Sequence, residues 1–186
     1  IGYPVELNDE WSLYCINSAL TSFAGYEWDS YPHLKDDRCR LNIDTRRLNE
    51  WIQNNGKKKI LMMHHPLSYL SEWANNEIAK LLKTNFDLIL TGHVHRQDVL
   101  CNQLQGESYV WCQAPQLFTD KSDKLGYCII EIEDDFVNRV IYREWFESRN
   151  CFKIGLDFTD SEDGIVEIDN NRHITYDPIR SLLEAN

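Results

Sequence analysis

Two short apolar runs in the middle of the chain have the pattern of β-strands that are covered on both faces. Residues 60–63 and 86–91 are rich in Ile and Leu, and a Pro or a Gly follows each run closely. The apolar residues between the runs recur at the spacing of one helix face, at Ala74, Ile78, Leu81 and Leu82. Ser71 precedes this face as an N-cap. The order strand, helix, strand predicts a right-handed crossover, with the carboxyl ends of two parallel strands at one sheet edge.

Further elements are predicted on both sides of this crossover. Residues 11–17 have the apolar run of a strand, and a second helix is predicted to begin at Asp44 or Thr45 and to end near Gly56. Between these two elements, residues 21–40 lack any periodicity, which is typical of a functional or mobile loop. The segments that alternate or run apolar later in the chain are 107–113, 126–133 and 137–145. This order of elements favours an α/β fold.

The last part of the chain differs from the rest. Residues 151–176 contain short alternating runs around an acidic turn, and Asp177 and Pro178 have the pattern of a helix start. The first residue is Ile rather than Met, and the sequence stops about two turns into the last helix. We interpret 1–150 as part of one domain, 151–176 as a small β appendage and 177–186 as the start of a helix that leads to a further segment.

Histidines follow both apolar runs of the crossover. His64 comes directly after the first run, and Gly92 and His93 come directly after the second. His95 lies two residues beyond His93, so in an extended segment both side chains project to the same side. We expect Gly92 to supply the sharp backbone turn that brings them in. Three converging imidazoles predict a metal site for Zn, Fe, Mn, Co, Ni or Cu. His65 alternates away from His64, and we place it outside the ligand set.

These motifs resemble those of a known family. Met-His64-His-Pro followed by Gly-His93-Val-His95 is similar to the last two motifs of the calcineurin-like metallophosphoesterases, in the same order and at a similar spacing. The resemblance implies metal-dependent hydrolysis of a phosphomonoester or phosphodiester. It also implies two divalent metal ions (Mn, Zn, Fe or Ni), with His64 and His93 on one ion and His95 on the other. These histidines are therefore the expected catalytic and metal-binding residues.

The resemblance covers only the later motifs of the family. The earlier motifs, Asp-x-His, Gly-Asp-x-x-Asp and Gly-Asn-His-Asp/Glu, are absent. The implied fold is the C-terminal part of a two-sheet α/β/β/α sandwich whose N-terminal half is missing, with 1–150 as the C-terminal half of the catalytic domain. The resemblance assigns 107–113, 126–133 and 137–145 to the second sheet of that sandwich.

The charge of the candidate ligands also indicates that part of the metal site is missing from this sequence. Two divalent ions ~3.5–4 Å apart repel each other, and neutral imidazoles alone do not offset that repulsion. The nearby acids Asp87 and Asp98 have no ligand-like neighbours, and we interpret both as solvated. We therefore expect a partner, the N-terminal half of the same domain in the same or a separate chain, and an inactive isolated fragment. The alternative is a catalytically inactive scaffold of this family that binds a protein partner.

Composition limits the binding partners and the cellular location that we expect. The net charge of −11, from 30 acidic and 19 basic residues, argues against a broad nucleic-acid footprint, although a nucleic-acid phosphate among the phosphate-ester substrates stays possible. No apolar run approaches the length of a membrane span. Six cysteines without a Cys-x-x-Cys pair favour a reduced, cytoplasmic protein. His33, in the polar loop, is interpreted as a surface residue.

Overall fold

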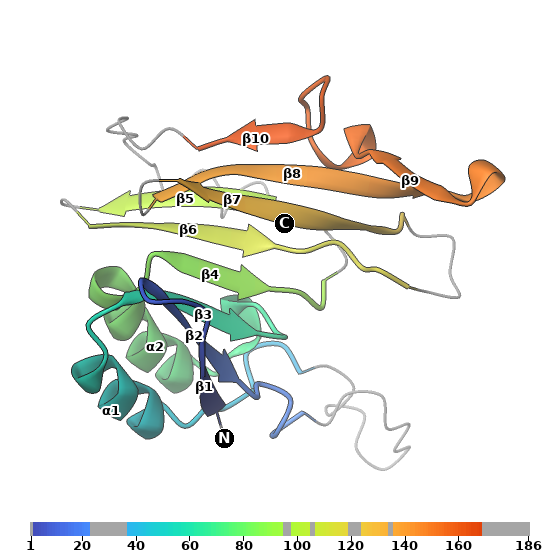
Figure 1. The fold of residues 1–186 in the computed structure, drawn as a ribbon. Helices are drawn as coiled ribbons and strands as arrows, with labels where there is room; N and C mark the ends of the chain where they lie inside the picture. The colour runs from blue at the N-terminus through green and yellow to red at the C-terminus, as the bar shows by residue number, and fades with distance from the viewer. Residues whose placement is uncertain are drawn as a thin grey trace, which may run out of the picture.

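The computed structural model places the apolar runs of the sequence in one large β-sheet (Figure 1). It describes residues 2–22, 37–94, 98–104, 107–118, 124–133 and 136–168. The strands of this sheet are β1 (Gly2–Glu6), β2 (Trp11–Ile16), β3 (Lys58–Met63), β4 (Leu88–Thr91), β5 (Asp98–Leu104) and β6 (Glu107–Gln113). Their order across the sheet is β1-β2-β3-β4-β6-β5.

The centre of this sheet is parallel. Strands β2, β3, β4 and β6 run in the same direction, whereas β1 and β5 pair antiparallel at the two edges. Because β3 and β4 are neighbours, with Ile60 opposite Leu88, their carboxyl ends lie at the same sheet edge. The predicted crossover between parallel strands is therefore confirmed. Pro4 lies in β1, an edge strand, which is the place in a sheet where proline is tolerated.

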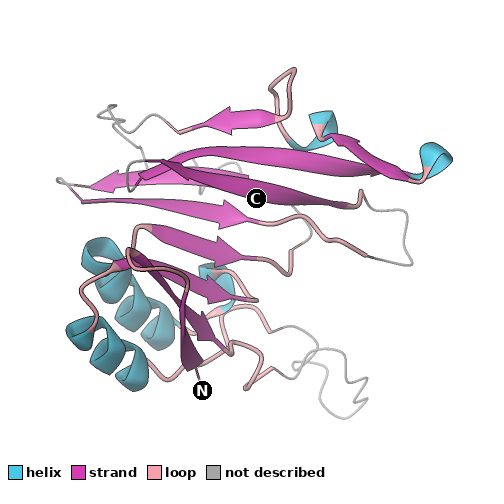
Figure 2. Ribbon diagram, in the orientation of Figure 1, coloured by secondary structure: helices cyan, strands magenta, loops and turns pink. Residues whose placement is uncertain are grey.

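Two described α-helices cover one face of this sheet, α1 (Arg46–Asn54) and α2 (Glu72–Asn85) (Figure 2). Helix α2 begins as predicted, because the Ser71 hydroxyl accepts the backbone N–H of Ala74 at 3.3 Å. Its apolar face is fully buried against the sheet, at Ala74, Ile78 and Leu82. Neither described helix combines the length and the apolar character that crossing a membrane requires.

A second, smaller sheet packs on the opposite face of the first. Its strands are β7 (Gly126–Glu133), β8 (Phe136–Phe146), β9 (Cys151–Ile154) and β10 (Ile165–Glu167). The order is β10-β8-β7, and β9 also pairs with β8. The core between the two sheets includes Leu88 and Val110 from the first sheet and Val140 and Tyr142 from the second. Helices, sheet and second sheet thus form successive layers (Figure 1).

Two details differ from the sequence-based expectations. The strand Glu107–Gln113 was assigned to the second sheet by resemblance, which is wrong, because β6 pairs in parallel with β4 in the first sheet. Strands β1 and β5 were not predicted at all. Segments 151–154 and 165–167 pair with β8 and so extend the second sheet. Residues 23–36 of the predicted loop, with His33, lie outside the described residues, as do 169–186 with the expected last helix.

The second sheet covers only part of the first. One row of residues crosses the first sheet in register and on one face, at Tyr3, Cys15, Met62, Leu90 and Cys112. At the β6 end of this row Cys112 is 1% exposed, in the core between the sheets. Towards the β1 end, Met62 on β3 is 39% exposed and Tyr3 on β1 is 62% exposed, whereas Cys15 on β2 between them is 8% exposed. The cover over this face is therefore incomplete at β3 and β1.

Candidate metal centre

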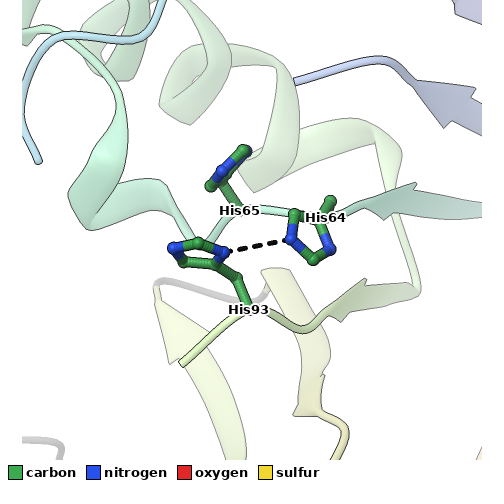
Figure 3. Close-up of side chains that lie close together, drawn as sticks. All are labelled: His64, His65 and His93. Carbon is green, nitrogen blue, oxygen red and sulfur yellow. Dashed lines mark hydrogen bonds between the residues drawn. The ribbon is translucent and has the colours of Figure 1, made fainter. Parts of the chain in front are cut away.

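Two strand ends bring the first two predicted histidines together. His64 follows β3 directly, and His93 follows β4 after Gly92. The backbone N–H of Gly92 donates to the carbonyl of His64 at 3.0 Å, which ties the two strand ends to each other beyond the regular ladder. Figure 3 shows the two rings facing one another from these ends. The parallel pairing of β3 and β4 thus places both imidazoles at the carboxyl edge of the sheet.

The nitrogens of these two rings are close. Nε2 of His64 lies 3.0 Å from Nδ1 of His93, and the ring centroids are 4.9 Å apart (Figure 3). His64 is exposed and His93 is half-buried, so the pair is open to solvent. Two imidazole nitrogens at this separation can turn their lone pairs towards one ion, since each metal–nitrogen bond is about 2.0–2.1 Å long.

The backbone of His93 has an unusual conformation. Its φ is +72°, in the left-handed region that residues with a Cβ rarely adopt. Gly92 was expected to supply the sharp turn, but it has no positive φ, and a Cβ on it would meet only the His64 carbonyl at an ordinary 3.7 Å. The turn is one residue later than expected. Such strain at a side chain that faces a polar cluster is typical of a functional site.

His65 lies in the cluster as well, although the sequence analysis placed it outside. Its ring centroid is 4.4 Å from that of His93 and 4.7 Å from that of His64. Residues 64 and 65 do not alternate as in a strand, because β3 ends at Met63. The signal that was missed is Ser18, which follows β2 at the same sheet edge and contacts His65.

Ser18 holds both the backbone and the ring of His65. The Ser18 hydroxyl oxygen accepts the His65 backbone N–H at 3.0 Å and lies 3.1 Å from the ring Nδ1. Both residues are buried, with His65 only 3% exposed. Tyr69 stacks on the imidazole at 5.6 Å between centroids and contacts His93 edge-on at 4.7 Å. The position of the His65 ring is therefore fixed from several sides.

Burial keeps His65 neutral. Burial, together with the neighbouring His93 and His64, lowers the pKa of His65 to about 4. The buried carboxylate of Asp37, which accepts a hydrogen bond from the Ser22 hydroxyl, acts on this pKa in the opposite direction but does not overcome the burial. An imidazole that stays neutral near pH 7 keeps a lone pair and adds no positive charge to the cluster.

The described donor set fits a transition-metal ion. The ligating nitrogens of His64, His65 and His93 all lie within 4.8 Å of one another, and neutral imidazole is a common ligand of such ions. Within the part of the chain that the structure describes, this cluster contains imidazoles and no carboxylate. His95 and its neighbour Arg96 lie outside the described residues, so the predicted convergence of His95 with His93 stays a prediction.

The acids near the histidines in sequence do not join this cluster. The carboxylate of Asp87 accepts from Nζ of Lys58 at 3.1 Å and from the backbone N–H of Lys59 at 2.9 Å. It lies just before β4, at the sheet edge opposite to His93. The interpretation of Asp87 as simply solvated was therefore wrong, whereas its exclusion from the ligand set fits this position. The side chain of Asp98 is not among those that the structure describes.

A comparison with known protein families identifies the chain. A family model described as calcineurin-like phosphoesterase matches residues 3–97, which is more than half of the 186 residues. The matched segment begins in β1 and includes His64, His65, His93 and His95. A comparison with curated proteins finds no match.

Proposed function

Because the chain belongs to the calcineurin-like phosphoesterase family, we propose that it provides half of a binuclear metal centre that hydrolyses phosphate monoesters or diesters. The observation that carries the proposal is the 3.0 Å approach of the His64 and His93 nitrogens at one sheet edge. Metal-dependent hydrolysis of phosphate esters is the general activity of this family, which supports the assignment. The substrate of this protein is accordingly a phosphate ester.

The roles proposed for the residues follow from their positions. His64 and His93 hold one ion, and His95, outside the described residues, holds the second. The chemistry that two divalent ions (Mn, Zn, Fe or Ni) supply when bound is Lewis-acid activation of water and of the phosphoryl group. His65 packs against His64 and His93 as a neutral ring, because Ser18 fixes its position and burial keeps it unprotonated.

Charge supports the proposal that the centre is incomplete in this chain. Two divalent ions ~3.5–4 Å apart need anionic ligands between or beside them. The described cluster supplies only neutral nitrogen ligands. We infer that carboxylates from a further segment complete the centre, and that this segment is the N-terminal half of the same domain, in the same or in a separate chain.

The packing of the first sheet also supports the proposal that a further segment completes the domain, because part of one sheet face is uncovered. An apolar row that is buried at Cys112 but 39% exposed at Met62 and 62% exposed at Tyr3 has room for further cover at β3 and β1. On this basis we propose that residues 1–150 are the C-terminal half of a two-sheet α/β/β/α sandwich. The boundary at 151, the separate segment 177–186 and the cytoplasmic location stay predictions.

A catalytic assay with matched chains tests the proposal. The assay follows hydrolysis of bis(p-nitrophenyl) phosphate and p-nitrophenyl phosphate with Mn²⁺, first with this chain alone and then with the polypeptide that carries the upstream motifs. We expect no turnover by the chain alone and metal-dependent turnover by the longer polypeptide. Full turnover by the chain alone would contradict the incomplete centre.

An inactive scaffold is the second candidate, and the absence of a carboxylate from the described cluster is the observation that favours it. In that case the longer polypeptide binds no pair of ions and shows no turnover, while the fold stays intact. The sequence upstream separates the two candidates, since Asp-x-His and Gly-Asp-x-x-Asp motifs there support the enzyme. Substitutions at those acids support the scaffold.

A further inference from the structure

Two cysteines from different sheets meet in the core between the sheets. Cys112 lies in β6 of the first sheet and Cys128 lies in β7 of the second. Their Sγ atoms are 3.8 Å apart, although the residues are separated by 16 positions in the sequence. Figure 1 shows β6 and β7 as facing strands of the two sheets. Both side chains belong to the apolar core that includes Val110 and Val140.

The two sulfur atoms are in van der Waals contact. A disulfide bond is about 2.05 Å long, so the sulfur atoms need to approach by roughly 1.8 Å. Cysteine has a single side-chain torsion before its sulfur, so closing this distance requires rotation about that torsion in one or both residues. Because both strands are paired within their sheets, the backbone holds the two thiols opposite each other.

The two thiols differ in access. Cys112 is 1% exposed and is sealed in the core, whereas Cys128 is half-buried and can be reached from solvent. An oxidant in solution therefore reaches Cys128 first. Cys112 lies on the buried side of this pair and can then react with the oxidised sulfur of Cys128. The difference in burial assigns Cys128 as the attacking thiol and Cys112 as the resolving thiol.

The hydrogen bond between the sulfurs also favours this order. It lowers the pKa of the Cys128 thiol, while burial acts against it. The thiolate is the nucleophile in thiol–disulfide exchange. Cys128 thus combines access to solvent with a neighbouring donor that stabilises its reactive form.

We propose that Cys112 and Cys128 are a modification site at which a small-molecule disulfide, such as glutathione disulfide, oxidises the pair to an intramolecular disulfide. The Cys128 thiolate attacks one sulfur of glutathione disulfide, forms a mixed disulfide and releases one glutathione thiolate. Sγ of Cys112 then attacks Sγ of Cys128, the bond to glutathione breaks, and a second glutathione thiolate leaves. The two cysteine thiols lose two electrons and two protons, and glutathione disulfide becomes two molecules of glutathione.

The bond ties together the two sheets next to the candidate metal centre. Cys112 is paired in register with Leu90 of β4, the strand that leads to His93. A covalent link at this row fixes the second sheet to the sheet that carries the histidines. The inference depends on the thiol geometry alone, so it stands or falls independently of the phosphoesterase proposal.

Peptide mapping after oxidation tests the proposal. The protein is incubated with glutathione disulfide, the remaining thiols are alkylated, and the protein is digested with trypsin and chymotrypsin and analysed by mass spectrometry without reduction. Cleavage after Tyr109 or Trp111 separates Cys101 from Cys112, so each cysteine is assigned on its own. We expect a cross-linked pair of peptides that contain Cys112 and Cys128. The exposed Cys39 and Cys151 serve as internal controls, since glutathione on them shows that the oxidant reacted.

Variants give a second readout. In Cys128→Ser, we expect Cys112 to stay reduced, because it is no longer reached through its neighbour. In Cys112→Ser, we expect Cys128 to stop at the mixed disulfide with glutathione. Oxidised wild-type protein is expected to unfold at a temperature higher by roughly 5 °C than the reduced protein, as for a short closed loop, and neither variant shows this rise. Glutathione on Cys39 and Cys151 with Cys112 and Cys128 both left as thiols would overturn the proposal, and so would a stable mixed disulfide at Cys128 in the wild type.

Discussion

The Ser18 hydroxyl makes two contacts with a single residue, His65, 47 positions away in the sequence. It accepts the His65 backbone N–H at 3.0 Å and lies 3.1 Å from the ring Nδ1. Ser18 follows β2 and His65 follows β3, which are parallel neighbours, so this contact closes the carboxyl edge of the sheet. The position of the His65 ring, which is the most deeply buried of the three imidazoles, thus depends on Ser18. The Ser18 side chain has no nitrogen with which to bind a metal ion.

The first prediction concerns Ser18→Ala. Removal of the hydroxyl leaves the buried His65 N–H without this acceptor, and we expect a loss of about 1–3 kcal/mol in the free energy of unfolding. Urea denaturation measures the change. Ser148→Ala, at an exposed position, is the matched control and is expected to stay within about 0.5 kcal/mol of the wild type. Equal stabilities for the two variants would contradict the role of Ser18.

The second prediction concerns the pH dependence of stability in metal-free protein. Burial lowers the pKa of His65 to about 4, below its ordinary value of about 6.5, so the unfolded chain binds this proton more tightly than the folded chain. The contribution to stability is complete above about pH 6.5 and is lost progressively as the pH falls towards 4. Urea unfolding in this window is expected to show a shallower pH slope for His65→Gln than for the wild type. Identical slopes would show that His65 titrates normally.

The third prediction uses the left-handed backbone of His93. His93→Gly and His93→Ala both remove the imidazole, but only glycine adopts a φ of +72° without a steric penalty. We expect the glycine variant to be more stable than the alanine variant by about 1 kcal/mol, as measured by denaturant unfolding. At Gln53, inside α1, the same comparison serves as control, and there alanine is expected to be the more stable. If alanine were the better residue at 93 as well, the turn would not be left-handed.

The fourth prediction tests the uncovered sheet face. Met62→Lys places a charge on the exposed part of the apolar row, where the chain alone tolerates it with a change of about 0.5 kcal/mol or less. In the longer polypeptide, or on complementation with the N-terminal half, the same change is expected to abolish phosphoesterase turnover because it blocks the additional layer. Trp73→Lys, at an exposed position on α2, is the control that keeps its turnover. Normal turnover by Met62→Lys would exclude this face as the docking surface.

The elements with a clear period were predictable from the sequence. Helix α2 was found because its apolar residues repeat at helical spacing after a Ser71 cap, and β3 and β4 because they are short apolar runs next to Pro and Gly. Edge strand β1 escaped detection because it contains Pro4 and its side chains are mostly exposed, so it has no buried face to mark it. Strand β5 lies at the other edge of the sheet, and its apolar and polar residues do not alternate with a strict period of two, so it lacked a clear strand pattern as well.

Only those residues of the candidate site whose positions follow from strand geometry were predictable from the sequence. His64 and His93 follow parallel neighbouring strands, so the crossover rule alone brought them together. The place of His65 in the cluster could be predicted only with knowledge of where β3 ends. Its contact with Ser18 is a tertiary contact that no local pattern contains. The left-handed conformation of His93 was also hidden, because an adjacent glycine is the more usual place for such a turn.

Metal affinity measured by isothermal titration calorimetry tests the central claim most directly. Metal-free wild-type protein is titrated with Mn²⁺ and with Zn²⁺ beside His64→Ala, His93→Ala and the control Asp87→Asn, whose carboxylate lies at the opposite sheet edge. We predict that each histidine variant loses more than about 100-fold in affinity, beyond the loss typical of an outer-shell change, while Asp87→Asn binds like the wild type. Unchanged metal affinity in both histidine variants would contradict the assignment of this sheet edge as the metal centre.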